Sequence, residues 1–571
     1  MDRGKNKDTH TFAKMATSDI VGFYRDRSVF ITGATGFMGK VLVEKLLRCC
    51  PGVKTLYLLM RPKAGNDIRT RLEELISTKV FDNLRRDSPE LMNKLVPIAG
   101  DMSLPSLGVS ATDIKMLSDN VSIVFHSAAT VKFDEALKSA VEMNLKGTMR
   151  LIELVRKLER LDALVHVSTA YANCDKDEIA EMIYPPPADP HKLMECVDWM
   201  DEELLKGITK KLIGKRPNTY TYTKALAEHL LMEECGGIPL AIVRPTIVTA
   251  AMKEPIPGWV DNLNGPTGLI AGAGKGLLRT LWCHTTMVAD VIPVEFPINL
   301  MIAVAWHTAT HKPNNIIVYN CASGYHNPLT WGEIERQGRV ALLKYPMSDV
   351  LWYPSGSFKS NLTLHKIDVV LYHYLPAYFL DFLARMSGNP AMLVRLYDKA
   401  HRAMSCLNYF TTHEWRFISE NPIQLLEKMS PEDRRVFYFD VRTIDWPSYI
   451  ETYALGTRRF ILKDDPSTLP AARRHMTRMF WIQQISRVAI LLLFWRAVVS
   501  RSETARRVWN LAFTMLVSMM RRMSAGAGIG IAKRREKKDE EKSRDMSKAS
   551  VDVNNSSTPS KAVSMSIAPI K

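Results

Sequence analysis

Tyr220 and Lys224 have the residue types and the spacing that proton transfer to a carbonyl group requires. The sequence from Tyr220 to Met232 predicts a helix, in which side chains four residues apart lie one turn apart on the same face. A free tyrosine has a pKa of about 10, and a lysine ammonium within roughly 4 to 6 Å lowers that pKa because it favours the phenolate. The pair therefore predicts a tyrosine that acts as a general acid.

Ser168 and Thr169 carry hydroxyl groups that could act with this pair. They follow the apolar run from Ala163 to Val167, which predicts a strand. A hydroxyl at the end of this strand could bond the carbonyl oxygen of a substrate and polarise it for hydride attack, and either residue could supply it. A tyrosine and a lysine at this spacing occur by chance in many helices, so the interpretation depends on the elements around them.

Two other residues compete for a catalytic role. Tyr222 lies on the same predicted helix, but its neighbour one turn later is Leu226, which cannot shift a pKa. His126 follows another predicted strand, from Ser122 to Phe125, and could be a base or a metal ligand. We interpret His126 as a packed residue at the end of its strand, and we expect no metal site.

The stretch from Val29 to Arg61 contains the element that would position these groups. A short apolar run ends at Thr32, three glycines follow at positions 33, 36 and 39, and an amphipathic helical pattern leads to a second apolar run, Thr55 to Met60. A tight turn from strand to helix needs positive φ, and a dinucleotide pyrophosphate can approach the backbone only where no Cβ intervenes. The stretch therefore predicts a dinucleotide-binding turn.

Arg61 and Lys63 indicate which dinucleotide binds. Arg61 falls at the end of the second strand, where the ribose of the cofactor would lie. An acidic residue there would bond the 2′-hydroxyl of NAD, whereas a basic residue neutralises the 2′-phosphate of NADP. We therefore expect NADPH, and Lys224 could also hold the nicotinamide ribose.

Alternating strands and helices extend this unit. Further strands are predicted at residues 95–98, 122–125, 163–167 and 240–244, with helical segments between them. Asp101 would bond the adenine amino group, and the small residues Ala128 and Ala129 would leave room for the cofactor at the carboxyl edge of the sheet. This alternation over about 220 residues predicts an α/β fold with a Rossmann-like, doubly wound parallel sheet. The candidate cofactor-binding residues are Thr32, Gly33, Thr35, Gly36, Phe37, Gly39, Arg61, Lys63, Asp101, Ala128, Ala129, Lys224 and Pro245.

Several motifs of the chain resemble those of one family. TGATGFMG, HSAATVKF, MNLKGT, HVSTAY, YTYTK and VRPTIV are similar to the extended short-chain dehydrogenases/reductases, and in particular to the fatty acyl-CoA reductases of animals such as insects. In the second half, VLYHYLPAYFLDFLARM, FTTHEWRF and FYFDVRTIDWPSYIETYALGTRRFILKDD resemble that family's C-terminal domain. The resemblance covers about residues 20–520. It implies NADPH-dependent reduction of long-chain acyl-CoA to a fatty alcohol, with Thr169, Tyr220 and Lys224 in the roles above and Asn144 completing a proton relay.

Other functions of the same fold are less consistent with the chain. A nucleotide-sugar dehydratase needs a pair of carboxylates just after the strand-end hydroxyl, where this chain has Ala170, Tyr171 and Ala172. A sterol or sugar dehydrogenase would keep the tyrosine and lysine but would not explain the second half. An aldehyde-releasing acyl-CoA reductase would share every residue named. A non-enzymatic, cofactor-sensing scaffold would have the catalytic trio by accident.

The chain divides into five predicted segments. These are a lead-in (1–22), an NADPH-binding reductase domain with substrate insertions (23–345), a mainly helical domain (346–475), a membrane-associated segment (476–523) and a disordered, charged tail (524–571). Residues 258–304 are either a loop with a sheet-covering helix or the wall of a substrate channel.

Two apolar regions bear on membrane contact. Residues 369–386 are apolar but are interrupted by His373, Pro376 and Asp381, which favours a buried or interfacial helix over a membrane span. Apolar runs with flanking arginines in 476–523 predict attachment by one tilted span, a hairpin or an amphipathic anchor, in which Arg496 could snorkel. The basic start of the tail favours the cytosolic face, and we expect the endoplasmic reticulum or peroxisomal membrane.

Composition limits the remaining possibilities. The 571 residues carry a formal net charge of +16, but no basic stripe is interleaved with aromatic residues, so nucleic-acid binding is not expected. Binding to an anionic membrane surface or to the phosphates of CoA explains the excess of positive charge better. The eight cysteines are scattered without a CxxC pair, which indicates a reducing compartment and no structural zinc. Residues 1–28 are polar, so no secretory signal is expected.

Overall fold

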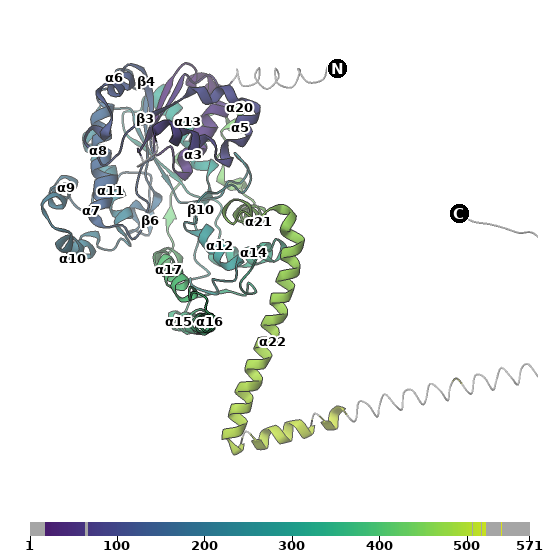
Figure 1. Ribbon diagram of the computed structural model, residues 1–571. Coiled ribbons are helices and arrows are strands. Elements are labelled where there is room, and N and C mark those ends of the chain that lie inside the picture. Colours follow the sequence, from purple (N-terminus) through teal and green to yellow (C-terminus); the bar gives the residue numbers. More distant parts are fainter. Residues whose placement is uncertain (1–17, 63–66, 505, 516, 521–537, 539–571) are drawn as a thin grey trace, which may run out of the picture. The chain divides into compact units, whose positions relative to one another are not determined.

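A computed structural model of the protein describes residues 18–62, 67–504, 506–515, 517–520 and 538 (Figure 1). The chain forms two compact units, one that ends at Phe480 and one that begins at Trp481. The catalytic candidates all belong to the first unit.

Parallel strands form the central sheet of the first unit, in the order β11-β7-β5-β4-β1-β2-β3. Strand order reverses between β1 and β4, and ligands of open α/β sheets bind at such a switch point. The predicted doubly wound sheet is confirmed, and the predicted strands agree with the observed ones to within a residue or two at each end. The strands are β1 (Ser28–Thr32), β2 (Thr55–Met60), β3 (Leu95–Ala99), β4 (Val121–His126), β5 (Ala163–Val167), β7 (Leu240–Pro245) and β11 (Ile317–Cys321).

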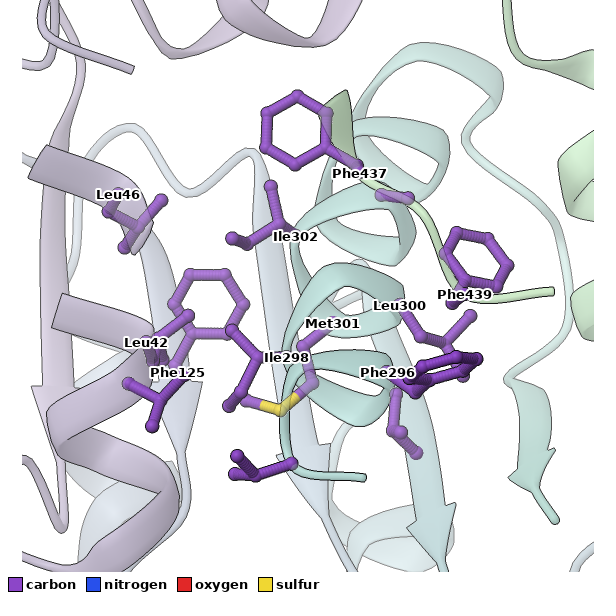
Figure 2. Packing of buried hydrophobic residues seen from close by; sticks show 14 of the residues in the cluster. Leu42, Leu46, Phe125, Phe296, Ile298, Leu300, Met301, Ile302, Phe437 and Phe439 are labelled. Carbon is purple, nitrogen blue, oxygen red and sulfur yellow. The ribbon is translucent and has the colours of Figure 1, made fainter. Parts of the chain in front are cut away.

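Helices cover both faces of the sheet. Alternate residues of β1 divide between the faces, since Val29 and Ile31 belong to one apolar cluster and Phe30 to another. The first cluster includes α3 (Phe37–Cys49) and α13 (Glu295–His311), and Figure 2 shows residues of α13 between those of α3 and Phe437. The second cluster includes α6 (Ala111–Asn120), α8 (Gly147–Val155) and α11 (Thr219–Glu234). Because strands buried on both faces need apolar residues throughout, the sequence shows them as continuous apolar runs.

Some predicted helices are divided differently. The helical segment between the second and third strands is divided into α4 (Ile68–Ile76), α5 (Asp82–Asp87) and short 3-10 turns. The segment before Tyr220 contains two helices, α9 (Pro190–Trp199) and α10 (Glu202–Ile213), because the Asp201 side chain caps the second one. Helix α2 (Asp19–Tyr24) begins after the Ser18 cap, at the end of the predicted lead-in, and buries Ile20, Val21, Phe23 and Tyr24.

Three small parallel strand pairs lie outside the central sheet. They are β8 (Ile247–Thr249) with β10 (Val291–Pro293), β9 (Thr280–Trp282) with β12 (Ser357–Lys359), and β6 (Glu178–Ile179) with β13 (Arg416–Phe417). The last two pairs join residues beyond 346 to earlier parts of the chain. The predicted domain boundary at residue 345 stays a prediction.

Residues 258–304 combine the two alternatives proposed for them. Helix α12 (Pro266–Gly274) lines a cavity, as a substrate wall would, whereas α13 is a buried helix that covers the sheet. The remaining helices of this unit are α7 (Leu137–Val141), α14 (Trp331–Lys344), α15 (Leu362–Val369), α16 (Leu375–Met386), α17 (Leu393–Ser405), α18 (Asn408–Thr412), α19 (Asn421–Lys428), α20 (Pro431–Val436) and α21 (Trp446–Gly456).

The apolar segment around residues 369–386 is not buried. It belongs to a continuous helix, Leu362–Met386, which is the one helix of the described residues that is long and apolar enough to cross a membrane. Only 17% of the 18-residue apolar stretch within this helix is buried. The buried-helix alternative for this segment was therefore wrong. Helix α22 (Leu469–Arg501) leads into the second unit, where apolar side chains such as Trp481, Leu491 and Phe494 are exposed. The predicted tail, 524–571, lies outside the described residues apart from Lys538.

Candidate active site

The glycine turn brings β1, α3 and the end of β4 together without intervening side chains. Gly33 has a φ of +78°, and a Cβ on it would lie 2.8 Å from the nitrogen of Ala128. A Cβ on Gly39 would lie 2.2 Å from the carbonyl oxygen of Gly33. The amide of Ala128 donates to Thr32 Oγ1 at 3.2 Å, which fixes the β4 loop beside the turn. The cradle of backbone at the start of α3 fits a pyrophosphate, as predicted.

Arg61 and Asp101 lie at the ends of β2 and β3 and contact each other. Arg61 Nε lies 2.7 Å from Asp101 Oδ2, and the arginine side chain remains 55% exposed. Burial raises the pKa of Asp101, but hydrogen bonds from Ser103 and the charge of Arg61 outweigh it, so that the pKa is lowered overall. Arg61 therefore stands at the edge of the cofactor site, where it can reach a phosphate. Lys63 lies outside the described residues.

Tyr220 and Thr169 meet at the carboxyl edge of the sheet. Helix α11 is capped by Asn218, whose side chain accepts a hydrogen bond from the Thr221 amide at 2.9 Å, and Tyr220 lies in its first turn. Thr169 follows the end of β5, and its side chain lies close enough to the Tyr220 phenol to act on the pKa of that group. The strand-end hydroxyl and the helical tyrosine are thus neighbours at this edge. Of the two hydroxyls considered, Thr169 is the one that acts on the pKa of Tyr220.

Lys224 does not act on Tyr220 in the predicted way. Burial raises the pKa of Tyr220 to about 12, opposed by the hydrogen bond from Thr169, and Lys224 is not among the causes. The Lys224 ammonium donates to the carbonyl of Val167 at 2.7 Å, and burial lowers its pKa to about 8. The predicted lowering of the tyrosine pKa was therefore wrong, because the lysine is bonded to β5 instead of the phenol. Tyr220 consequently keeps its proton at neutral pH and can donate it.

Asn144 holds helix α11 in place. It lies in a π-helical turn between α7 and α8 and is 2% exposed. Its amide oxygen accepts from the Thr130 amide at 2.9 Å, and its amide nitrogen donates to the Thr223 hydroxyl at 3.0 Å. These bonds tie the loop after β4 to the residue beside Lys224. A part in a proton relay stays a prediction.

Ser168 and Pro245 complete the edge of the sheet around Thr169. Ser168 Oγ is buried and has no hydrogen-bond partner among the described residues. The carbonyl of Pro245, at the end of β7, lies 3.5 Å from the Thr169 hydroxyl.

The two residues that compete with this group for a catalytic role, His126 and Tyr222, are packed in other parts of the structure. His126 is buried between the hydroxyls of Thr32 and Thr148, as predicted for a packed residue.

Tyr222 belongs to the core. It is fully buried in the apolar cluster of α7, α9 and α11, so it points away from Tyr220. Burial also raises the pKa of Tyr222. The choice of Tyr220 over Tyr222 is consistent with this placement.

A buried ion pair fixes the middle of α11 on β7. Arg244 Nη2 lies 2.6 Å from Glu228 Oε2, and the two side chains are 0% and 1% exposed. Arg244 also donates to the carbonyls of Ala180 and Met182. Glu228 is one turn after Lys224, and its charge raises the lysine pKa against the larger effect of burial. The pair was not found from the sequence, because VRP and AEH give no sign that their side chains meet.

Aromatic side chains cover Tyr220. The ring of Phe133 is stacked on that of Tyr220, with 6.0 Å between the centroids and 30° between the planes, and the centroid of the Phe410 ring lies 5.3 Å from that of Phe133. Tyr171 contacts Phe410 and Trp415 edge to face. Phe410 and Trp415 belong to the motif FTTHEWRF, so the second half of the chain contributes the apolar cover of the site. The sequence marked this motif but not its position.

An elongated, apolar cavity of about 120 Å³ lies among α12, α14, α21 and the β9–β12 pair. Thr249 and Val291, from the β8–β10 pair, form part of its wall, and β8 directly follows β7. Arg279, Glu335 and Arg339 contribute charged groups to the lining. Its apolar lining includes Leu269, Ile270, Leu281, Leu329, Trp331, Phe358, Ile450 and Tyr453.

Comparisons with known proteins agree with this site. Sequence models described as male sterility protein match residues 31–301 and 372–464. Fatty acyl-CoA reductase 1 of Xenopus laevis is 44% identical over 496 residues, which are 87% of this chain and 96% of the relative. The human protein of the same name is 42% identical and covers 86% of this chain and 95% of its own length. The reductase domain of a nonribosomal peptide synthetase from Mycobacterium tuberculosis has the same fold, with a TM-score of 0.50, 19% identity and coverage of 79% of this chain and 96% of that one.

The fold and the site define an NAD(P)-dependent oxidoreductase of the extended short-chain dehydrogenase/reductase class. Relatives that are 42 to 44% identical over nearly their whole length place it more narrowly. The chain belongs to the fatty acyl-CoA reductase family.

Proposed function

We propose that this protein reduces long-chain fatty acyl-CoA to the fatty alcohol with NADPH, through an aldehyde held in the site. The proximity of Thr169 to Tyr220 at the edge of the sheet supports this most directly. It places a proton donor and a second hydroxyl where a carbonyl oxygen can receive both.

Each residue of the site has a defined task in this reaction. The cofactor supplies a hydride in each of two reductions. Thr169 and Tyr220 bond the thioester oxygen, and Tyr220 protonates it, which gives a hemithioacetal. As the C–S bond of the hemithioacetal breaks, its hydroxyl proton returns to the Tyr220 phenolate, and CoA leaves as the thiolate, which takes up a proton from solvent. Tyr220 then protonates the aldehyde oxygen in the second reduction, which yields the alcohol.

The chain holds the cofactor with groups that fit it. The backbone around Gly33 and Gly39 can hold the pyrophosphate, and Arg61 can neutralise the 2′-phosphate. Lys224 can hold the nicotinamide ribose if it exchanges its bond to Val167. The acyl chain is assigned to the cavity beside β8, because its wall is almost wholly apolar.

A membrane location follows from the second unit. We assign membrane attachment to residues 476–523, where α22 exposes Ile485, Val488 and Leu491 beside arginines. The reductase domain would face the cytosol on the endoplasmic reticulum or peroxisome. The isolated segment 474–523 should then stay in the membrane pellet through a salt wash, and its release into the soluble fraction would argue against this segment.

Activity assays with one matched pair of variants test the function. Membranes that contain the full chain should consume NADPH with long-chain acyl-CoA and form alcohol, identified by chromatography. Tyr220→Phe should lower turnover by at least roughly a thousandfold while NADPH binding is retained. Tyr222→Phe, two residues away in the core, should leave turnover within a few fold. Equal activity of the two variants would remove Tyr220 from its role, and accumulation of aldehyde would favour an aldehyde-releasing enzyme.

A further inference from the structure

Helices α15, α16 and α17 form a helical hairpin, residues 362–405, that projects from the first unit (Figure 1). Asp381 closes the hairpin, because its carboxylate accepts hydrogen bonds from the amides of Met392, Leu393 and Val394 at 2.9 to 3.0 Å. These bonds cap the start of α17 against α16. The hairpin is therefore a folded element and not a loose loop.

The base of the hairpin is bonded to the wall of the apolar cavity. His373 Nε2 accepts a hydrogen bond from the backbone amide of Arg279 at 3.0 Å, and His365 Nδ1 lies 3.1 Å from the Thr280 hydroxyl. The guanidinium of Arg279 lies 4.8 Å from the ring centroid of Tyr372. Arg279 and Thr280 both line the cavity. The hairpin thus begins where the cavity wall meets the surface.

The outer part of the hairpin exposes apolar side chains around most of a helix. In α16, Ala377 and Asp381 are buried, and they face α17. At about 100° per residue, the exposed apolar positions extend over roughly 200° of the helix circumference. A protein partner would cover one face, whereas lipid surrounds a helix on every free side. The exposed side chains are Leu375 (59%), Tyr378 (61%), Phe379 (60%), Leu380 (47%), Phe382 (58%), Leu383 (42%) and Met386 (74%).

Only the outer part of the hairpin is free to enter lipid, and it is too short to span a membrane. The first part of the continuous helix Leu362–Met386 is bonded to the cavity wall through His365 and His373, which leaves α16, with 12 residues, as the outer part. At 1.5 Å per residue this outer helix is about 18 Å long, against a hydrocarbon core of about 30 Å. Arg385 and Arg395 are exposed beside the apolar surface, and Lys399 and Arg402 follow on α17. Cations at this level match the phosphates of anionic lipids.

We propose that the 362–405 hairpin inserts into one leaflet of a membrane that contains anionic phospholipids. Because its base is bonded to the cavity wall, insertion sets the mouth of the cavity at the lipid surface. The acyl chain of the substrate then enters from the leaflet and the alcohol returns to it, a consequence that rests on the proposed function. This contact is separate from the anchor assigned to residues 476–523.

A fluorescent label tests insertion in the full chain. Phe379→Cys and, as the control, Leu204→Cys on α10, whose side chain is 55% exposed, each carry an NBD group on protein reconstituted in phosphatidylcholine and phosphatidylserine vesicles. The unsubstituted chain, treated with the same label, gives the background fluorescence from labelled native cysteines. Lipids with a spin label on the acyl chain should quench the label at position 379 several-fold more than the label at position 204. Equal quenching would overturn the proposal, as would shielding of position 379 that occurs without lipid and accompanies a dimer.

A charge-insertion variant tests the consequence for the substrate. Phe379→Asp with Leu383→Asp should raise the KM for long-chain acyl-CoA offered in vesicles by roughly tenfold, because carboxylates oppose insertion into lipid. The KM for short-chain acyl-CoA offered in solution should stay unchanged, and Leu204→Asp should change neither value. An equal rise for both substrates would contradict entry from the leaflet. If the wild-type chain reduces no acyl-CoA at all, the proposed function fails, whereas the quenching result still decides insertion.

Discussion

At the scale of single residues, burial moves the two central groups of the site in opposite directions. It raises the pKa of Tyr220 to about 12 and lowers the pKa of Lys224 to about 8. Both changes favour the neutral form, as expected when charge is taken out of water. At neutral pH the phenol therefore carries its proton, while Lys224 remains mostly charged at an energetic cost. Its bond to the Val167 carbonyl reduces that cost.

This cost predicts a pH-dependent effect of Lys224→Met on stability. Between about pH 8 and the unfolded lysine value of about 10.5 the unfolded chain binds more protons, so the stability of the wild type rises with pH in this window. The free energy of unfolding of the variant should therefore fall by about 3 kcal/mol relative to that of the wild type between pH 7 and pH 10.5. Thermal unfolding at several pH values measures the difference. Lys210→Met, at an exposed position of α10, is the control. If the stability difference from the wild type is independent of pH for both variants, the prediction is wrong.

Arg61 carries a separate prediction about the cofactor. Its side chain is half exposed at the end of β2, and its loss would remove a charge-assisted contact with the 2′-phosphate. Arg61→Ser should raise the KM for NADPH by roughly 10- to 100-fold, since such contacts contribute about 1.5–3 kcal/mol, and should change the KM for NADH much less. Steady-state kinetics with both nucleotides would show this. An equal change in the KM for NADPH and for NADH would mean that Arg61 does not bind the 2′-phosphate.

At the scale of elements, the turn between β1 and α3 is fixed by backbone contacts that no side chain can enter. Gly39→Ala would place a carbon 2.2 Å from a carbonyl oxygen, so the start of α3 must move. We expect this variant to lose NADPH binding and about 2 kcal/mol or more of stability. Gly207→Ala on α10, where an added Cβ meets no atom within 4 Å, should be neutral or slightly stabilising. Cofactor titration and thermal unfolding of both variants would measure the contrast, and normal binding by Gly39→Ala would count against the turn.

Elements of this kind could be predicted because their causes are local. Buried parallel strands appear as apolar runs, and the glycine spacing marks the turn between β1 and α3. The contact between Lys224 and Val167 could not be predicted from the sequence, because it depends on how α11 lies against β5. The cover of Tyr220 by Phe133 and Phe410 likewise joins residues that are far apart in the sequence. The sequence left α16 as either a buried or an interfacial helix, because an apolar helix of that length suits a core and a lipid surface equally well.

At the scale of the whole first unit, the two halves of the chain share one substrate region. The β9–β12 pair and the β6–β13 pair attach the later segment to the reductase sheet, and α21 and α14 lie against each other beside the cavity. The end of the reductase sheet therefore carries the catalytic candidates, whereas residues 249–342 and the later segment together form the apolar wall of the cavity, and Phe410 of the later segment contributes to the aromatic cover. Substrate choice should depend on residues remote from Tyr220.

Gly338 offers a direct test of this division. It lies in α14 and lines the cavity, and an added Cβ there would meet no atom within 4 Å, so a side chain can start at this position without a clash. Gly338→Phe should displace two or three methylene groups of a long acyl chain, which at about 0.8 kcal/mol each lowers kcat/KM roughly tenfold or more. Short-chain acyl-CoA should be reduced at the wild-type rate, because its chain ends before the new ring. NADPH consumption across a series of chain lengths measures the effect, with Gly207→Phe on α10 as the matched control. A loss that is uniform across chain lengths would mean that this cavity does not hold the acyl chain.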